Sequence, residues 1–367
     1  MKHLGKALIY AIVAVNMLFV GLLLFSAYSP WLINPTVHPV LSCFGLIFPV
    51  FLLINFCFLI FWVFTYPKLA LISALGFILC FGQIRTYIPI NSRTDKIPQH
   101  CIKVLSYNVM GFNKLKKHTP TDPNPILQYI LKRKPDIICL QEFQFSTDRS
   151  HLTEKDINSA LSDYPYHNKT NVSAVGNGNW VACYSKFPIL SSRLIKYKST
   201  YNGSVVYELL IKGDTVTVIN NHLESNKLTK EDKDVYVDMI KEPEAGKVKR
   251  GVRHLVKKLA EASAIRALQA KAVSKEIASF KHQSMIVCGD FNDTPISYAH
   301  RVIAQDLDDA FTQSGRGLGI SYNQHMFYFR IDNILISKNL TAYNCTVDNS
   351  IKESDHYPIW CYIAIKK

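Results

Sequence analysis

Residues 285–293 join a short apolar run to a cluster of polar side chains. The run Met285–Cys288 has the length and composition of a buried strand, and Gly289 ends it. Two positions apart on an extended backbone, the carboxylate of Asp290 and the amide of Asn292 are expected to point to the same side. They can then meet one substrate together, Asp290 as an acceptor or base and Asn292 as a donor. The alternative is an Asp/Asn turn that only ends the strand.

Polar residues also stand at the ends of other apolar runs. These residues are Asn108, Glu142, His222, Asp332, Asp355 and His356. Oxygen ligands suit a hard cation, so Glu142, Asp355 and the amide oxygen of Asn108 are candidate metal ligands. The two histidines supply imidazoles of the kind that titrate near neutrality. Together the set indicates metal-assisted acid–base chemistry, although each residue taken alone also suits a turn or a surface ion pair.

Several common catalytic motifs are absent from the sequence. It contains no P-loop, no G-x-G-x-x-G, no G-x-S-x-G and no H-E-x-x-H. The nine cysteines show no C-x-x-C pairing of the kind that binds zinc, and their odd number and spacing do not suggest a disulfide framework. Cys139 and Cys288 fall in predicted core strands, so we interpret them as small buried apolar residues.

The N-terminal part of the chain is almost uniformly apolar. The runs Ala7–Tyr28 and Val40–Phe64 are each long enough to span a bilayer. A signal peptide is the alternative for the first run, but no small-residue cleavage site follows it and a second long run comes soon afterwards. Leu69–Gly82 is shorter and suits either a third span or a re-entrant or interfacial helix.

The number of spans decides the side of the membrane on which the rest of the chain lies. Lys2 and Lys6 favour a cytoplasmic N-terminus, and the loop Ser29–Pro39 contains no lysine or arginine. Three spans then place the remainder outside the cytoplasm, whereas two leave it inside. Basic residues at 85, 93 and 96 favour the cytoplasmic side weakly. We expect three spans in an integral membrane protein, which places the rest of the chain outside the cytoplasm.

Residues 93–100 are polar and are expected to form a linker, and from residue 101 to residue 367 the pattern is that of an α/β domain. Apolar runs predict strands at 102–107, 137–140, 180–184, 205–211, 215–219, 285–288, 330–337 and 357–365. Helical patterns cover 125–134, which Pro135 ends, 252–259 and 265–272. Lys212-Gly213-Asp214 predicts a hairpin turn between two of the strands. Residues 224–250 are polar and are expected to form a surface excursion.

The charge is uneven. The formal net charge of the chain is +14, and residues 1–92 contribute only four basic residues and no acidic one. A basic soluble part indicates a polyanionic partner, which can be nucleic acid, an acidic membrane surface or a phosphorylated small molecule. The alternative is a solvated surface. Two stretches can contact such a partner, the basic Lys241–Lys258 and the aromatic Tyr322–Phe329 with His325, Phe327 and Tyr328.

Six short motifs, in order, resemble the endonuclease/exonuclease/phosphatase superfamily, which includes DNase I-like nucleases, apurinic endonucleases, neutral sphingomyelinases and inositol polyphosphate 5-phosphatases. The motifs are Leu-Ser-Tyr-Asn-Val at 105–109, Asp-Ile-Ile-Cys-Leu-Gln-Glu at 136–142, Asn-His-Leu at 221–223, Gly-Asp-Phe-Asn-Asp at 289–293, Arg-Ile-Asp-Asn-Ile-Leu at 330–335 and Ser-Asp-His-Tyr-Pro at 354–358. The similarity extends from about residue 101 to the C-terminus. Residues 1–92 lie outside it and resemble the membrane anchor of some bacterial members.

The resemblance implies a four-layer fold, in which two β-sheets pack face to face between outer helices, with the N-terminal transmembrane helices preceding it. It also implies a site for Mg²⁺, or alternatively Mn²⁺. Carried over by motif, Glu142 holds the metal, Asn108 lies beside it, and Asp355 completes or supports the ligand set.

The same resemblance assigns roles to the remaining polar residues. Asp332 orients the imidazole of His356, which abstracts a proton from the attacking water or stabilises the phosphorane. His222 contacts the phosphate or assists the leaving group. Asn292 adds a neutral donor, and Asp290 positions or deprotonates the water. Such a division suits an anionic phosphate ester, whose charge a metal ion and donors must neutralise.

The sequence therefore predicts a membrane-anchored, metal-dependent phosphoesterase that hydrolyses a phosphodiester. Among the possible substrates, we slightly favour nucleic acid. A phospholipid or sphingomyelin-type phosphodiester, or a small phosphorylated substrate, is the alternative. A non-catalytic, membrane-tethered binding domain is a more remote one, since both histidines and all the expected carboxylates are present. No protein partner can be inferred.

Overall fold

The computed structural model describes residues 2–176, 178–241, 245–280, 284–324 and 327–365. The chain divides into two compact units. The first comprises Met1–Tyr87, Thr229–Ala264 and Ile296–Tyr298, and the second comprises Ile88–Leu228, Ile265–Pro295 and Ala299–Lys367. All predicted site residues belong to the second unit.

Helices form the N-terminal part of the first unit. They are α1 (Lys2–Leu32), α2 (Pro39–Ser42), the 3₁₀ turn η1 (Cys43–Ile47), α3 (Phe48–Thr65), the 3₁₀ turn η2 (Pro67–Leu69), α4 (Ala70–Leu79) and α5 (Phe81–Tyr87). Lys6–Leu32 and Pro39–Thr65 are long and apolar enough to cross a membrane. Pro67–Leu79 and Phe81–Tyr87 are long and apolar enough for a membrane span only when taken together, and the chain bends by 66° between them. By length and composition, the N-terminal helices thus suit two or three spans.

Buried polar side chains join three of these helices. Asn16 of α1 donates to the hydroxyl of Ser73 of α4 over 3.0 Å. The indole of Trp62 in α3 donates to the amide oxygen of Asn16, also over 3.0 Å. In an apolar surrounding such hydrogen bonds hold helices together, because the alternative is an unsatisfied polar group.

Two further helices follow the polar segment after residue 224. They are α9 (Lys230–Lys241) and α10 (Ala245–Ser279). The expected surface excursion is therefore largely helical, and the two helices expected at 252–259 and 265–272 are one continuous helix. The apolar stripe of the first continues into the second without a proline or glycine after Gly251, so nothing in the sequence ends the helix. Residues 265–279 of α10 belong to the second unit.

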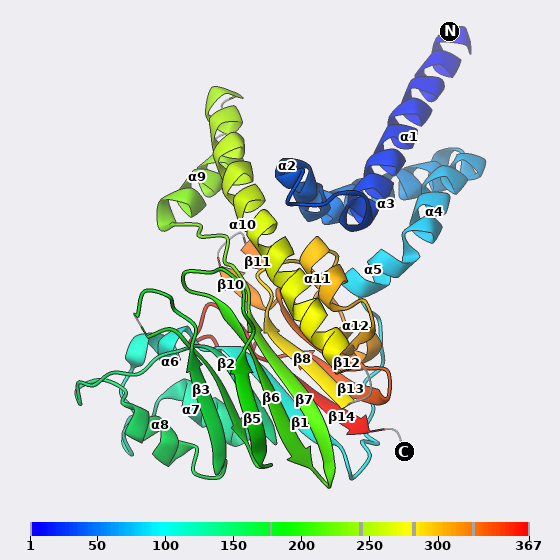
Figure 1. Cartoon of the computed structure of the whole chain (residues 1–367). Helices are drawn as coiled ribbons and strands as arrows, with labels where there is room; N and C mark the ends of the chain where they lie inside the picture. Colours follow the sequence, from blue (N-terminus) through cyan, green and yellow to red (C-terminus); the bar gives the residue numbers. More distant parts are fainter. Residues whose placement is uncertain (1, 177, 242–244, 281–283, 325–326, 366–367) are drawn as a thin grey trace. The chain divides into compact units, whose positions relative to one another are not determined.

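The second unit is built on two six-stranded sheets (Figure 1). In the first sheet the order is β13 (Leu340–Val347), β14 (Ile359–Ile365), β1 (Ile102–Asn108), β2 (Ile137–Phe143), β4 (Trp180–Ser185) and β3 (Tyr166–Asn171). In the second it is β5 (Ile189–Leu194), β6 (Gly203–Ile211), β7 (Asp214–His222), β8 (Ser284–Asp290), β12 (Asp332–Ser337) and β9 (Leu307–Asp309). A separate hairpin pairs β10 (Tyr322–Gln324) with β11 (Phe327–Phe329). The short helices are α6 (Met110–Leu115), α7 (Pro125–Arg133), α8 (Glu154–Ala160), α11 (Tyr298–Ile303) and α12 (Ala310–Ser314).

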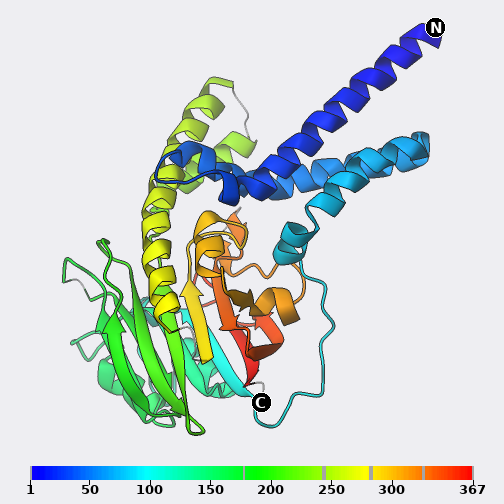
Figure 2. The same cartoon turned by 45° about the vertical axis from the view of Figure 1, so that its right-hand side comes forward.

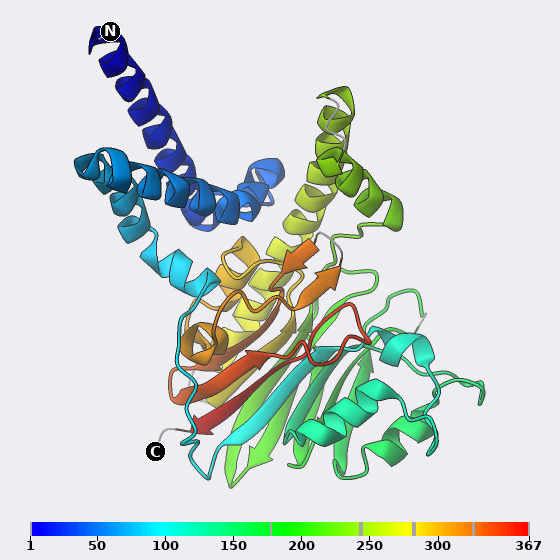
Figure 3. The ribbon, with the colours of Figure 1, turned by 180° about the vertical axis from the view of Figure 1, so that it is seen from behind.

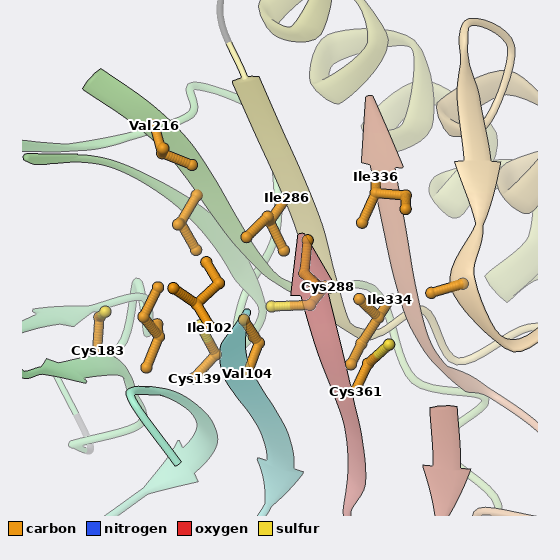
Figure 4. Packing of buried hydrophobic residues seen from close by; sticks show 14 of the residues in the cluster. Ile102, Val104, Cys139, Cys183, Val216, Ile286, Cys288, Ile334, Ile336 and Cys361 are labelled. Atoms are coloured by element: carbon orange, nitrogen blue, oxygen red, sulfur yellow. The ribbon is translucent and has the colours of Figure 1, made fainter. Parts of the chain in front are cut away.

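Apolar side chains from the two sheets meet in one core (Figure 4), which includes Val104, Cys139, Val216, Ile286 and Ile334. On the outer face of the first sheet, a second cluster packs α7 and α8 against β1 and β2 (Figure 3). On the outer face of the second sheet, a third cluster packs residues 270–277 of α10 and residues 299–303 of α11. The expected four layers, helix, sheet, sheet and helix, are confirmed. Cys139 and Cys288 are buried free thiols, as expected.

Local sequence signals explain several boundaries. The side chain of Asn124 accepts from the backbone N–H groups of Ile126 and Leu127 and so caps α7, and Pro125 occupies the first turn. The predicted hairpin between β6 and β7 is confirmed, and Lys212 and Gly213 take positive φ values of 54° and 95°.

Strand direction gathers the site at one end of the sandwich. β1 and β2 are parallel neighbours in one sheet, and β7 and β8 are parallel neighbours in the other. The antiparallel β12 and β14 begin where β8 and β1 end. The polar residues that follow or precede these strands therefore lie at the same end of both sheets.

Candidate active site

The first sheet contributes Asn108 and Glu142. Asn108 is the last residue of β1 and pairs with Gln141 of β2. Glu142 has a φ of 48°, and the register of β2 against β4 shifts between Leu140 and Phe143. A bulge of this kind changes the direction in which a side chain leaves the strand. It brings the Glu142 carboxylate to 3.2 Å from the amide nitrogen of Asn108.

The second sheet contributes His222, Asp290 and Asp332, which lie side by side. His222 ends β7 and pairs with Asp290, the last residue of β8, and Asp290 pairs in turn with Asp332 at the start of β12. Gly289 has a φ of 126°, and a Cβ atom there would lie 2.0 Å from the backbone oxygen of Asn221. Only glycine permits this close packing of β7 and β8 directly beneath Asp290.

Asp290 is held by two amides. The Nδ2 atom of Asn108 lies 3.2 Å from its carboxylate. Asn292 donates to the same carboxylate through its backbone N–H over 2.8 Å and its Nδ2 atom over 3.2 Å. Asn292 has a φ of 52°, so the expectation that an extended backbone aligns Asp290 with Asn292 is wrong. A left-handed turn brings the two side chains together instead.

His356 lies between two carboxylates. Its Nδ1 atom lies 2.8 Å from Asp332, and its Nε2 atom lies 3.6 Å from Asp290. An ionised carboxylate only accepts hydrogen bonds, so Asp332 fixes the proton on Nδ1. The ring of Tyr322 packs edge-on against the imidazole, with 5.2 Å between ring centroids.

His222 faces the same group of acids. Its Nε2 atom lies 3.7 Å from Glu142 and 3.9 Å from Asp290. Its Nδ1 atom is buried and has no hydrogen-bond partner among the described residues. Burial lowers the pKa of His222 below 6.5, against the pull of Asp290. The side chain is therefore predominantly neutral at pH 7.

Asp355 is less closely bound than the other acids. Its backbone oxygen accepts from the N–H of Asn323, and its side chain is partly exposed. Its charge nevertheless acts on the group, since it adds to burial in raising the pKa of Glu142 and adds to Asp332 and Asp290 in raising the pKa of His356. The structure thus brings all eight predicted residues to one end of the sandwich.

The electrostatics of the group are those of a largely buried acidic cluster. Burial raises the pKa of Asp290 from 3.8 to about 6, although His356 opposes the shift. Burial also raises the pKa of Glu142, against the hydrogen bond from Asn108. For His356, burial lowers the pKa, but the adjacent charges of Asp332 and Asp290 outweigh it and raise the pKa well above 6.5.

These residues fit a divalent cation. Several carboxylates lie close together where burial opposes their ionisation, so a cation bound among them would stabilise their ionised forms. The Oδ1 atom of Asp332 is buried and lacks a hydrogen-bond partner within the part of the chain that the structure describes. Candidate ligand atoms of Asp290, Asp332 and His356 lie within 4.8 Å of one another.

Two sets of ligands are possible for such an ion. One is Asp290, Asp332 and His356, and the other is the predicted set of Glu142, Asn108 and Asp355. Both ring nitrogens of His356 face a carboxylate, and a metal would displace one of those contacts. Glu142, whose side chain is 34% exposed, is the more accessible ligand. The amide oxygen of Asn108 accepts from the N–H of Met110, so it reaches an ion only if the amide turns over. The set Glu142, Asn108 and Asp355 stays a prediction.

Sequence reasoning missed several residues that support the site. The hydroxyl of Ser354 donates to the backbone oxygen of Asn108 and accepts from the N–H of His356. Ser321 accepts from the N–H of Asp332. Ser354 precedes the predicted Asp-His pair and could have been found there. Ser321 precedes β10, and nothing in its sequence connects it with the site, whereas Tyr322 begins the aromatic stretch that was considered only as a contact for a polyanion.

A buried arginine joins the loops behind the site. Arg266 of α10 donates to Asp293 over 3.1 Å, and to the backbone oxygen of Glu224 and the side chain of Asn226 over 2.9 and 2.8 Å. Asp293 directly follows Asn292, and Glu224 is the second residue after His222. Arg266 therefore holds two segments in fixed positions relative to each other, the one that carries Asn292 and the one that carries His222.

Comparison with known families assigns this geometry. Residues 105–356 match the Endonuclease/Exonuclease/phosphatase family. The chain belongs to this family. Its members are phosphoesterases that generally use a divalent metal, and the acidic cluster described above has the corresponding donors. Residues 7–87 match a second family, which is described only as a domain of unknown function. No curated protein matches the chain.

Solved structures agree with the family's fold. An endonuclease/exonuclease/phosphatase protein from Beutenbergia cavernae is 14% identical with a TM-score of 0.51, and the match covers 73% of this chain and 72% of that one. A humanised D. rerio TDP2 is 14% identical with a TM-score of 0.50, and the match covers 72% of this chain and all of that one. At such identities the likeness shows the fold alone.

Proposed function

We propose that the chain is a membrane-anchored, Mg²⁺-dependent phosphodiesterase, with residues 1–92 as the anchor, 93–100 as a linker and 101–367 as the catalytic domain. The observation that carries the proposal is the Asp332–His356–Asp290 array beside Glu142. It combines a fixed imidazole with carboxylates whose ionisation is opposed by burial. These are the groups that hydrolysis of an anionic ester requires.

Asp290 is the residue best placed to accept a proton from water. Burial brings its pKa to about 6, close to the pH at which a general base is most effective. The amides of Asn108 and Asn292 hold its carboxylate in one orientation. A water molecule bound at this carboxylate can be deprotonated as it attacks phosphorus.

His356 then serves as a cationic donor rather than as a base. Its pKa lies well above 6.5 because the charges of Asp332 and Asp290 outweigh burial, so the ring is protonated at neutral pH. The Nε2 proton can stabilise charge that develops on a phosphoryl oxygen. Asp332 keeps the ring in that orientation through Nδ1.

His222 and the proposed metal ligands complete the site. Neutral His222 can donate from one ring nitrogen to a phosphate oxygen or to the leaving group. Glu142, Asn108 and Asp355 would hold the ion. When bound, Mg²⁺ or Mn²⁺ neutralises charge on the non-bridging oxygens and stabilises the leaving oxygen.

Nucleic acid is the first substrate to test. The chain has a formal net charge of +14, and all but four of its lysine and arginine residues lie after residue 92. The basic stretch Lys241–Lys258, described except for residues 242–244, lies mainly in α10. Within the aromatic stretch Tyr322–Phe329, β10 pairs with β11, and His325 lies outside the described residues.

A phospholipid phosphodiester is the second candidate, and the apolar N-terminal helices favour it. Two helices suit membrane spans by length and composition, and a bent pair can make a third. An anchor of this kind holds a catalytic domain near lipid headgroups. We propose three spans in the bacterial inner membrane and an extracytoplasmic catalytic domain.

A hydrolysis panel tests the proposal. The full chain in detergent is incubated with Mg²⁺ and DNA, RNA, sphingomyelin, phosphoinositides or nucleotides. Cleavage of a diester is expected. Release of phosphate from soluble monoesters alone would contradict a phosphodiesterase, and inactivity on every substrate would favour a binding domain. Protease accessibility on intact cells tests the side of the membrane.

A further inference from the structure

The segment after the last N-terminal helix is fastened to the second unit. We call residues 88–96 the strap; Figure 2 shows it as part of the extended chain before β1. Asn91 of the strap donates to the backbone oxygen of Gly315 over 2.8 Å. The N–H and C=O of Thr94 both bond to the side-chain amide of Asn344, over 3.0 and 2.7 Å. The strap therefore has a fixed path over this unit.

A cavity of about 630 Å³ lies beside the strap. Its polar lining includes two arginines, Arg93 and Arg316, together with four asparagines and several hydroxyl groups. None of the described residues that line it is acidic, and neither arginine forms an ion pair with any described residue. Guanidinium groups are the donors best suited to a phosphate, whereas the amides of Asn91 and Asn344 already donate to backbone oxygens. The cavity therefore has the chemistry of an anion site.

Exposed apolar side chains surround these arginines. Ile90 of the strap is 85% exposed and pairs with Arg316 through its backbone. Leu318 and Tyr328, which line the cavity, are 45% and 50% exposed. Arginine, tyrosine and aliphatic side chains in one patch are typical of surfaces that lie at a membrane interface.

The chain also limits how far the strap can lie from the N-terminal helices. Arg93 follows Tyr87, the last residue of α5, by only six positions. An extended chain covers at most about 3.5 Å per residue, so these two residues lie within roughly 20 Å of each other. If the N-terminal helices lie in a bilayer, the cavity is within reach of its headgroups.

We propose that this cavity binds the phosphate of an anionic phospholipid headgroup, with Ile90, Leu318 and Tyr328 against the interfacial region. The inference rests on the membrane anchoring proposed above and not on the catalytic mechanism. Arg93 and Arg316 bind the phosphate, and the lipid becomes a second attachment of the catalytic unit to the membrane, in addition to the chain itself.

The cavity is distinct from the acidic cluster of the candidate site. Tyr322 of β10 packs against His356, whereas the next residue, Asn323, lines the cavity. Successive residues of a strand point to opposite faces. A headgroup in the cavity is thus separated from His356 by β10, and it is retained rather than hydrolysed.

Binding of short-chain lipids to the full chain in detergent tests the proposal. The probes are dihexanoyl phosphatidylglycerol, dihexanoyl phosphatidylcholine and inorganic phosphate, and affinities are measured by thermophoresis. The wild type is expected to bind phosphatidylglycerol at least tenfold more tightly than the other two probes. Arg93→Ala/Arg316→Ala is expected to lose at least tenfold in that affinity. Arg93→Gln/Arg316→Gln preserves more of the side-chain volume and serves if the alanine pair does not fold.

The control is Arg149→Ala/Lys196→Ala, which removes two exposed cations that do not line the cavity. It is expected to bind like the wild type. The proposal would be overturned by any of three results. These are an equal loss of lipid affinity in both double variants, unchanged lipid binding in the Arg93/Arg316 double variant, or no lipid binding by the wild type. Inorganic phosphate that binds as tightly as the lipid would identify a free-phosphate site instead. Hydrolysis of a soluble substrate, expected to be unchanged in all variants, reports separately on the proposed enzyme.

Discussion

The Nδ1 atom of His356 lies 2.8 Å from the carboxylate of Asp332, although the two residues adjoin strands of different sheets. Asp332 begins β12 of the second sheet, and His356 precedes β14 of the first. The pair therefore joins the two halves of the sandwich at the end where the other predicted site residues gather. Its geometry depends on how the sheets pack.

This relationship predicts that Asp332 acts through His356. Asp332→Asn is expected to lower kcat by roughly 10²–10⁴-fold with little change in KM, because the ring loses its fixed tautomer and part of its charge. His356→Ala should cost about as much. The double variant should be no worse than His356→Ala alone, since both changes remove one function. Multiplied losses in the double variant would show that the two residues act independently.

Glu142 is predicted to be needed for activity and not for folding. Glu142→Gln keeps the volume of the side chain but removes the charge proposed to hold the ion, so hydrolysis should fall by orders of magnitude. Circular dichroism and thermal denaturation should remain close to those of the wild type. Glu154→Gln is the matched control, because Glu154 lies away from the candidate site and forms a partly exposed ion pair with Lys169. An unchanged rate in Glu142→Gln would remove this residue from the mechanism.

Removal of the metal should be reversible. Chelation by EDTA is expected to abolish hydrolysis, and Mg²⁺ or Mn²⁺ should restore it. A ligand at a hundred times its Kd stabilises the folded state by about 2.7 kcal/mol, so Mg²⁺ should also raise Tm. Glu142→Gln should lose most of that increase. Full activity in EDTA, or an equal rise in Tm for both proteins, would contradict the proposed metal site.

His300 predicts a loss of stability in mild acid. It is buried, with its ring 6.1 Å from that of Phe291, and burial lowers its pKa from 6.5 to about 4, although Asp309 opposes the shift. As pH falls from 6.5 to 4, the unfolded chain binds the proton first, so the free energy of unfolding decreases by up to about 3 kcal/mol. Below pH 4 both states are protonated, and this group contributes no further loss.

His300→Gln removes the titrating group, so its free energy of unfolding should fall less than that of the wild type between pH 6.5 and 4. Denaturant unfolding at several pH values measures the difference. Parallel curves for the two proteins over this range would show that His300 does not take up the proton on unfolding.

Much of the fold could be predicted because its signals are local. The apolar N-terminal runs, the cap at Asn124, the turn at Gly213 and the buried runs that become β1, β2, β7 and β8 depend on neighbours in sequence. The same applies to the candidate site, since each polar residue adjoins a recognisable strand. The first turns of α10 were missed because residues 245–250 are polar and contain Gly246, and so resemble a loop when no packing partner is known.

The sequence by itself determined which polar side chains adjoin strand ends and are candidates for the site, because residue type and apolar periodicity are properties of the chain alone. Only the tertiary structure decided how they meet. The positive φ values of Glu142 and Asn292, the placement of Tyr322 on His356 and the fixed path of the strap all arise from contacts between distant segments. Burial among those segments also sets the pKa values of Asp290 and His356, since desolvation and neighbouring charges exist only after the sheets have packed.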